Sequence, residues 1–280
     1  MRLVICTLVV LALPSSAFAG DFDILRGPVA TTNWGGFYAG GQIGADYNSV
    51  DFSSVATPYI NTISTLDANF NGIPLTHFPQ LGSLNTTKAS YGFYVGYNVQ
   101  FEDAVIGLEL NLNKTSLNAI ASNTASHTYF QTANSTVYDT TYNVNTSAAA
   151  AIQDYGTFRA RFGWAVDQFL PYAFGGISVA QVNASSSVNV NYCGQESPFT
   201  CTNPPPASSP PPPAPIGGNW TLSDSSHGKY YYGFDAGVGL QWMLMPHVFL
   251  RGELEYIRFG SPDAIRLGET SARLGGGVQF

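Results

Sequence analysis

Apolar and polar residues alternate with a period of two along several short segments of the chain. The clearest segment is 90–101, where Tyr91 and Phe93 lie on one face and Asn98 and Gln100 lie on the other. This period indicates a β-strand whose two faces meet different surroundings. The same alternation predicts seven further strands, at 37–46, 106–113, 157–164, 170–182, 230–242, 250–256 and 272–280.

The lengths of these strands and of their connections predict a membrane barrel. Most of the strands come close to the roughly 9–11 residues that cross an outer membrane. Short connections at 102–103, 167–168 and 243–247 alternate with longer ones at 48–89, 114–154, 183–228 and 257–271. We therefore predict an all-β fold: an eight-stranded antiparallel transmembrane β-barrel with short periplasmic turns, long extracellular loops and both termini in the periplasm.

Three segments modify this simple scheme. Gly175 and Gly176 blur the alternation within 170–182 and predict a bulge or bend. Residues 114–152 keep an alternating Thr-, Asn- and Ala-rich pattern, part of which extends strands beyond the membrane as a hairpin. The proline-rich segment 204–215 is typical of a polyproline spacer, which is either a floppy loop tip or a rigid presenting arm.

The first residues predict export from the cytoplasm. Arg2 precedes an apolar run at 3–13, and Ala17 and Ala19 flank Phe18 in the small-x-small pattern of a cleavage site. We predict a signal peptide at 1–19, a periplasmic segment at 20–33 and the barrel at 34–280. The cell outer membrane is the expected location.

Charge and composition exclude some classes of partner. Removal of Arg2 with the leader leaves 10 basic and 18 acidic residues, a net charge of −8. This balance argues against nucleic acid and against an anionic lipid surface as partner. Only 10% of the residues are charged, against about a quarter in soluble domains.

Residues 33–48 resemble the opening of the small outer-membrane porin and surface-antigen family of the opacity/OmpA-like β-barrel superfamily. The opening motif of that family is matched at Trp34, Gly36, Phe37, Tyr38 and Gly40. The end of the chain resembles the sorting signal that outer-membrane proteins present to the barrel-assembly machinery, which is carried here by Leu274, Val278 and Phe280.

The resemblance implies an eight-stranded barrel with a role in membrane integrity, surface antigenicity or adhesion, and sometimes porin activity. It covers the strands but not the long loops. It also implies contact with outer-membrane lipid and lipopolysaccharide, and an external ligand or host surface could bind the loops. The peptidoglycan-binding domain of OmpA-type proteins is not expected, because the sequence stops at the last strand.

Charged residues on the inward faces of the predicted strands are the main candidate site. An eight-stranded barrel is just wide enough for side chains to fill, so buried charges there must be paired. We predict a lumenal ion-pair network formed by Asp46, Glu109, Arg159, Arg161, Asp235, Arg251, Glu253, Glu255 and Arg273. The network is either a structural plug or the gate of a narrow pore.

Aromatic residues near the strand ends predict aromatic girdles at the two membrane interfaces. The alternative interpretation is a sugar-binding platform. They are Tyr47, Tyr91, Trp164, Tyr230, Trp242 and Tyr256.

The predicted loops carry few chemical signals. Cys193 and Cys201 form a close pair, which predicts a disulfide in an oxidising compartment. The disulfide would serve either protection from proteases or recognition of a partner. His77, His127 and His227 are scattered over three loops with no spacing that marks a nucleophile, a metal or a haem site.

These features lead to one main functional prediction. We expect a non-enzymatic outer-membrane structural and surface protein that displays long external loops, without metal or cofactor. A narrow porin-like diffusion channel is the alternative. An outer-membrane lipid-modifying enzyme is the third hypothesis, and it requires a His, Ser and acid cluster at the outer rim.

Overall fold

The computed structural model describes residues 32–66, 81–133, 135–197, 199, 201, 214–260 and 264–280. The predicted leader at 1–19, nearly all of the segment 20–33, His77 and most of the proline-rich segment lie outside the described residues.

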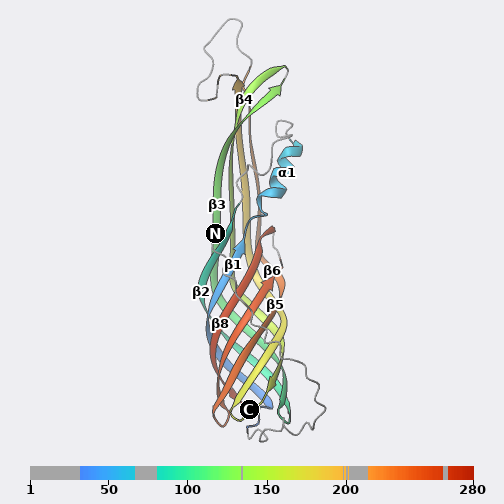
Figure 1. Cartoon of the computed structure of the whole chain (residues 1–280), viewed down its shortest axis with the longest axis vertical. Helices are drawn as coiled ribbons and strands as arrows, with labels where there is room; N and C mark the ends of the chain where they lie inside the picture. Colours follow the sequence, from blue (N-terminus) through green and yellow to red (C-terminus); the bar gives the residue numbers. More distant parts are fainter. Residues whose placement is uncertain are drawn as a thin grey trace, which may run out of the picture.

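Eight antiparallel strands close into one barrel in sequence order, and β1 pairs with β8 (Figure 1). The predicted fold class is confirmed. None of the described helices is long and apolar enough to cross a membrane. The strands are β1 (Gly36–Asp51), β2 (Ser83–Phe101), β3 (Ala104–Ala133), β4 (Thr136–Trp164), β5 (Phe169–Glu196), β6 (Ile216–Met245), β7 (Val248–Phe259) and β8 (Arg266–Gln279).

The predicted alternation determines which side chains face out. Phe93 is 59% exposed on the outer surface, whereas its neighbour Tyr94 is 1% exposed and points into the barrel. Ile43 and Leu254 likewise lie on the outer surface. In a barrel that crosses a membrane, an apolar outer surface is in contact with lipid.

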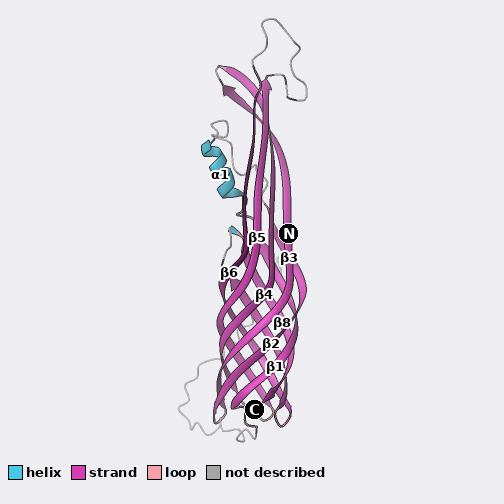
Figure 2. Cartoon of the chain, turned by 180° about the vertical axis from the view of Figure 1, so that it is seen from behind, coloured by secondary structure: helices cyan, strands magenta, loops and turns pink. Residues whose placement is uncertain are grey.

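Four strands continue far beyond the barrel (Figure 2). The predicted hairpin extension within 114–152 is present, since β3 and β4 stay paired there, whereas 183–228, which was predicted as a loop, contains long parts of β5 and β6. Pairing of β2 with β3 stops at Tyr91 and Lys114, but β3 and β4 stay paired as far as Ala133 and Thr136. We call the four-stranded extension the upper sheet. It comprises 117–133 of β3, 136–152 of β4, 182–196 of β5 and 216–229 of β6.

The strands are irregular at the base of the upper sheet and not at the predicted glycine pair. Gly175 and Gly176 pair in continuous register with β4 and β6, so the predicted bulge is absent there. A Cβ on Gly176 would lie 2.1 Å from the Phe158 carbonyl oxygen and 2.6 Å from the Arg159 Cα. The absence of a side chain at Gly176 therefore leaves space for the neighbouring Arg159. Three register shifts lie at this base, between Lys114 and Leu117, Ile152 and Tyr155, and Val182 and Ala184. A fourth lies at the lower end of the barrel, between Met243 and Met245.

One helix, α1 (Ala56–Leu66), packs against the upper sheet within the connection that was predicted as a loop (Figure 1). Ala56, Ile60 and Ile63 recur every three or four residues, which places them on one helix face. They are at most 1% exposed, and they pack in one cluster with Val188 and Val190 of β5. The inner face of the upper sheet is thus an apolar core of its own.

Candidate functional site

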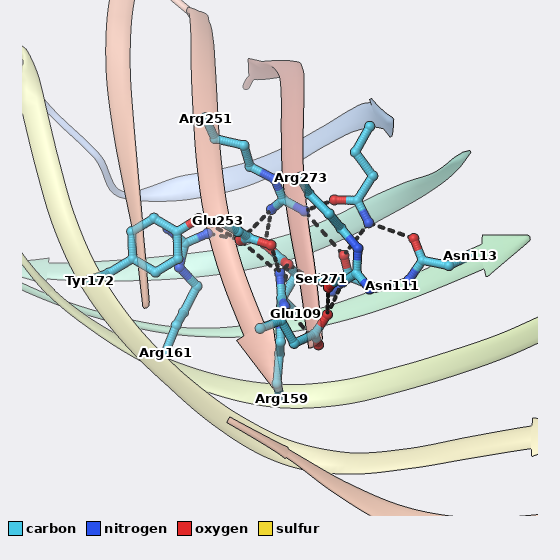
Figure 3. A network of polar contacts seen from close by, with 12 residues as sticks. Glu109, Asn111, Asn113, Arg159, Arg161, Tyr172, Arg251, Glu253, Ser271 and Arg273 are labelled. Atoms are coloured by element: carbon cyan, nitrogen blue, oxygen red, sulfur yellow. Dashed lines mark hydrogen bonds and ion pairs between the residues drawn. The ribbon is translucent and has the colours of Figure 1, made fainter. Parts of the chain in front are cut away.

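Charged side chains from four strands meet in the lumen of the barrel (Figure 3). Glu109 lies on β3, Arg159 and Arg161 on β4, Glu253 on β7 and Arg273 on β8. Each of them alternates with outward-facing residues, so the pleat of its strand directs it inward. The sequence predicted these five side chains at inward positions, and the structure brings them together.

Glu109 is the centre of the network. Its carboxylate lies 2.5 Å from Arg159 Nη2, 3.0 Å from Arg161 Nη1 and 2.8 Å from Arg251 Nη1. Tyr38 donates a further hydrogen bond to Oε2 over 2.7 Å. The side chain of Glu109 is fully buried, so each of these contacts replaces water that the carboxylate has lost.

Glu253 connects two of these arginines, Arg159 and Arg251, from the opposite wall of the barrel. It lies 2.8 Å from Arg159 Nη2 and 3.4 Å from Arg251 Nη1, and it accepts a 2.5 Å hydrogen bond from the Tyr172 hydroxyl. Arg159 also reaches Glu255 over 3.4 Å. Since Arg159 contacts three carboxylates, this one guanidinium links β3 to β7.

A second group of charges lies above this centre. Arg273 forms an ion pair with Glu255, approaches Asp46 to 3.9 Å and Glu269 to 3.4 Å. Glu269 was missed in the sequence because the last strand was predicted to begin at residue 272, whereas β8 begins at Arg266. Once the strand is extended by six residues, Glu269 lies four residues from Arg273 on the same strand, so both side chains point into the lumen.

Asp235 was predicted to belong to the lumenal network, but it forms no ion pair with the other members. It is 2% exposed and faces the lumen, but its hydrogen bond comes from Ser178 over 3.4 Å. Within the described residues no arginine lies within ion-pair distance of its carboxylate. The other eight predicted residues are all linked by ion pairs.

Aromatic rings complete the packing of the arginines, and no pairing of ring with charge was predicted from the sequence. The Arg159 guanidinium lies 3.9 Å from the centroid of Phe174, and that of Arg251 lies 3.3 Å from the centroid of Tyr94. Arg161 stacks at 3.9 Å on Tyr172. Such contacts stabilise a desolvated cation by roughly 2 kcal/mol.

Two apolar layers enclose the charges within the lumen. The lower cluster includes Leu170, Met243 and Phe249, none more than 7% exposed. The upper cluster includes Ile257 and Phe259 from β7 and continues into the core of the upper sheet. The lumenal charges therefore lie between two groups of buried apolar side chains.

The other predicted residues lie at the ends of the strands and on the outer surface. Cys193 and Cys201 are bonded in the structure. Phe37, Leu274, Val278 and Phe280 all face outward, whereas Trp34 and Tyr38 face inward. A Cβ on Gly40 would lie 2.3 Å from the Gly276 carbonyl oxygen, so β1 and β8 come close together there. Gly36 has a φ of 120°, a backbone conformation that favours glycine.

The predicted girdle residues are exposed on the outer surface at both ends of the barrel. Exposure ranges from 42% to 64%. They are Tyr47, Tyr91, Trp164, Tyr230, Trp242 and Tyr256.

The two described histidines of the predicted loops do not lie together. Through the strand register, His127 is level with Gly218 of β6, nine residues from His227. At about 3.3 Å per residue this separation is about 30 Å. Within the described ranges no group of three His, Cys, Asp or Glu residues could hold a metal ion.

The comparisons with known proteins identify the family. A family model described as "Outer membrane protein beta-barrel domain" matches residues 5–280, so the chain belongs to the outer-membrane β-barrel proteins. A comparison with curated proteins finds no match.

Solved structures give a distant likeness. Ail, the attachment invasion locus protein of Yersinia pestis, is 12% identical over 88% of this chain and 99% of that chain, with a TM-score of 0.30. Neisserial surface protein A is 14% identical over 87% of this chain and 97% of that chain, with a TM-score of 0.34.

Proposed function

We propose that the protein is an outer-membrane surface protein that holds the upper sheet outside the cell on a closed, non-conducting barrel. One observation carries the proposal: half of the barrel wall continues upward as a four-stranded sheet with its own core (Figure 2). On β3 the upper sheet adds residues 117–133, which at about 3.3 Å per residue reach about 55 Å.

Orientation follows from the connections at the two ends. The three short turns lie at the end where the chain terminates in Phe280, opposite the upper sheet (Figure 1). Outer-membrane barrels keep short turns in the periplasm and long connections outside. This asymmetry supports an orientation in which the upper sheet extends beyond the outer leaflet.

A filled lumen favours a function in which the barrel displays the upper sheet over one in which it transports solutes. Eight strands leave space only for side chains, and here the space is filled by an ion-pair network between two apolar layers. A diffusion channel would require a continuous polar path, and both apolar layers interrupt it. The barrel then serves to anchor the sheet.

Cysteine labelling of intact cells tests this arrangement. Ser223 lies exposed on the outer face of the upper sheet, and Gln168 lies exposed in a lower turn. A membrane-impermeant maleimide should label Ser223→Cys in intact cells and Gln168→Cys only after the outer membrane is broken. The native chain, whose Cys193 and Cys201 are bonded, gives the background. The reverse pattern would refute the proposed orientation.

A further inference from the structure

The lipid-facing surface carries a groove across the strands that close the barrel. Its volume is about 1020 Å³, and it runs over β6, β7, β8, β1 and β2. Its floor is formed by small residues, Ala45, Gly252 and Ala272, while Leu254 and Leu274 stand beside them. Because this surface faces hydrocarbon, the groove can hold an acyl chain.

The groove leads upward to polar side chains on the same strands. Residues that are paired across β1, β8 and β7 and point outward form rows on the outer surface. The row that contains Ala45 and Ala272 is followed, toward the upper sheet, by a row of Tyr47, Thr270 and Tyr256. The tyrosines are 48% and 45% exposed. Tyrosine prefers the membrane interface because its ring is apolar and its hydroxyl is polar.

Two arginines lie above these tyrosines. Arg258 and Arg266 are exposed, and together with Tyr47 and Tyr256 they line a second recess of about 180 Å³. Arg258 pairs with Gly268, so Arg266 is its diagonal neighbour across β7 and β8, roughly 7–8 Å away. This spacing suits two side chains that approach one anionic group from either side.

The positive charge of this recess is only partly neutralised. Arg266 has Asp51 at 4.0 Å, and within the described residues Arg258 has no carboxylate within ion-pair distance. Elsewhere on the outer surface, Lys114 has Asp154 at 3.9 Å, so a single cation there is matched by a single acid. Among the residues that the structure describes, this recess is lined by two arginines, Arg258 and Arg266, and one acid, Asp51, so its local balance is more positive than the net charge of the chain.

We propose that this face binds one phosphorylated glycolipid of the outer leaflet, lipopolysaccharide. An acyl chain lies in the groove over Gly252 and Ala272, and a lipid A phosphate lies between Arg258 and Arg266. Tyr47, Thr270 and Tyr256 contact the sugar at the interface. The order of apolar, amphipathic and cationic rows along one face is the order of these parts in the lipid.

Titration of the purified full-length barrel with lipid A, followed by mass spectrometry of the intact complexes, tests the site. We expect one bisphosphorylated lipid A per barrel. Arg258→Gln and Arg266→Gln should each weaken binding about fivefold, since a basic side chain near a lipid surface contributes about that factor. The double variant should lose about 25-fold, and the matched control Lys114→Gln should stay within about twofold of the native chain.

A second variant tests the groove separately from the charges. A Cβ on Gly252 would meet its nearest atom, Leu274 Cδ2, only at 3.7 Å, so Gly252→Leu fits the fold and fills the groove. It should weaken lipid A binding while the boiling-dependent gel shift of a folded barrel is retained. Dephosphorylated lipid A should bind as weakly to the native chain as lipid A binds to the double arginine variant.

Three results would overturn the proposal. Equal binding of phosphatidylglycerol and lipid A would mean a general attraction for anionic lipid. An equal loss in Lys114→Gln would remove the special role of the β7–β8 face. Rapid disulfide dimerisation of Gly252→Cys in native membranes would assign the groove to a second copy of the chain. None of these outcomes bears on the labelling of Ser223→Cys, so the proposed orientation is tested independently.

Discussion

Replacement of Glu109 by glutamine tests whether the lumen is dry. Glu109→Gln keeps the size of the side chain and removes its charge, which leaves Arg159, Arg161 and Arg251 with one fewer counter-charge. Loss of one partner from a buried ionic group costs about 3–5 kcal/mol, because the remaining charges stay desolvated. For a chain of this size that corresponds to a melting temperature lower by roughly 6–20 °C.

Heat-modifiability measures this loss directly, since the folded barrel and the boiled chain migrate differently on a gel. Vesicles that contain the native or variant barrel are heated in steps, and the folded fraction is scored at each temperature. Glu102→Gln, in an exposed lower turn, is the matched control and should change the midpoint by less than about 2 °C.

A double variant isolates the pair from the rest of the network. Within the described residues Glu109 is the sole carboxylate within ion-pair distance of Arg161. Adding Arg161→Gln to Glu109→Gln should therefore recover at least about 1 kcal/mol of the loss. If Glu109→Gln stays within about 1 kcal/mol of the native barrel, water or salt reaches the carboxylate. The account of a sealed lumen would then be refuted.

Three further predictions concern the two apolar layers of the lumen, helix α1 and the Cys193–Cys201 disulfide. The native barrel and Arg159→Ala and Glu253→Ala should show no single-channel steps in planar bilayers; steps that change with either variant would mean a conducting lumen. Ile60→Ala should lower protection of α1 from amide exchange by about 2–4 kcal/mol and leave the barrel melting unchanged. Reduction of the Cys193–Cys201 bond should speed cleavage within that loop without shifting the barrel midpoint; a shifted midpoint would mean that the two are coupled.

The membrane part of the fold was predictable because each strand there is in contact with lipid on one face. The alternation of the outward Phe93 with the inward Tyr94 results from that contact. Eight segments with this alternation predicted the correct number and order of strands. Parity within a strand also identified the inward position of Glu109 and Arg159. Which inward charges meet was not predictable, because this depends on the stagger between strands.

The sequence predicted a strand extension only within 114–152 and predicted 183–228 as a loop, because the alternating pattern of the upper sheet is inverted. In the membrane the apolar residues of β4, such as Phe158, face out, but above it Val144 faces in and Asn145 faces out. The register shift between Ile152 and Tyr155 lets the same even-numbered positions change sides. No local sequence signal marks this irregularity, so it was not predicted.

The lumenal network also determines when the barrel becomes complete during insertion. Arg251 and Glu109 are 142 residues apart in the chain, so this contact across the lumen forms only when β7 has taken its place in the ring between β6 and β8. A chain halted after β6 would expose Glu109 and Arg159 to water without Glu253, and its wall would stay open. Final closure of β1 against β8 therefore coincides with the expulsion of water from the charges, which makes assembly cooperative and incomplete barrels easy to distinguish from finished ones.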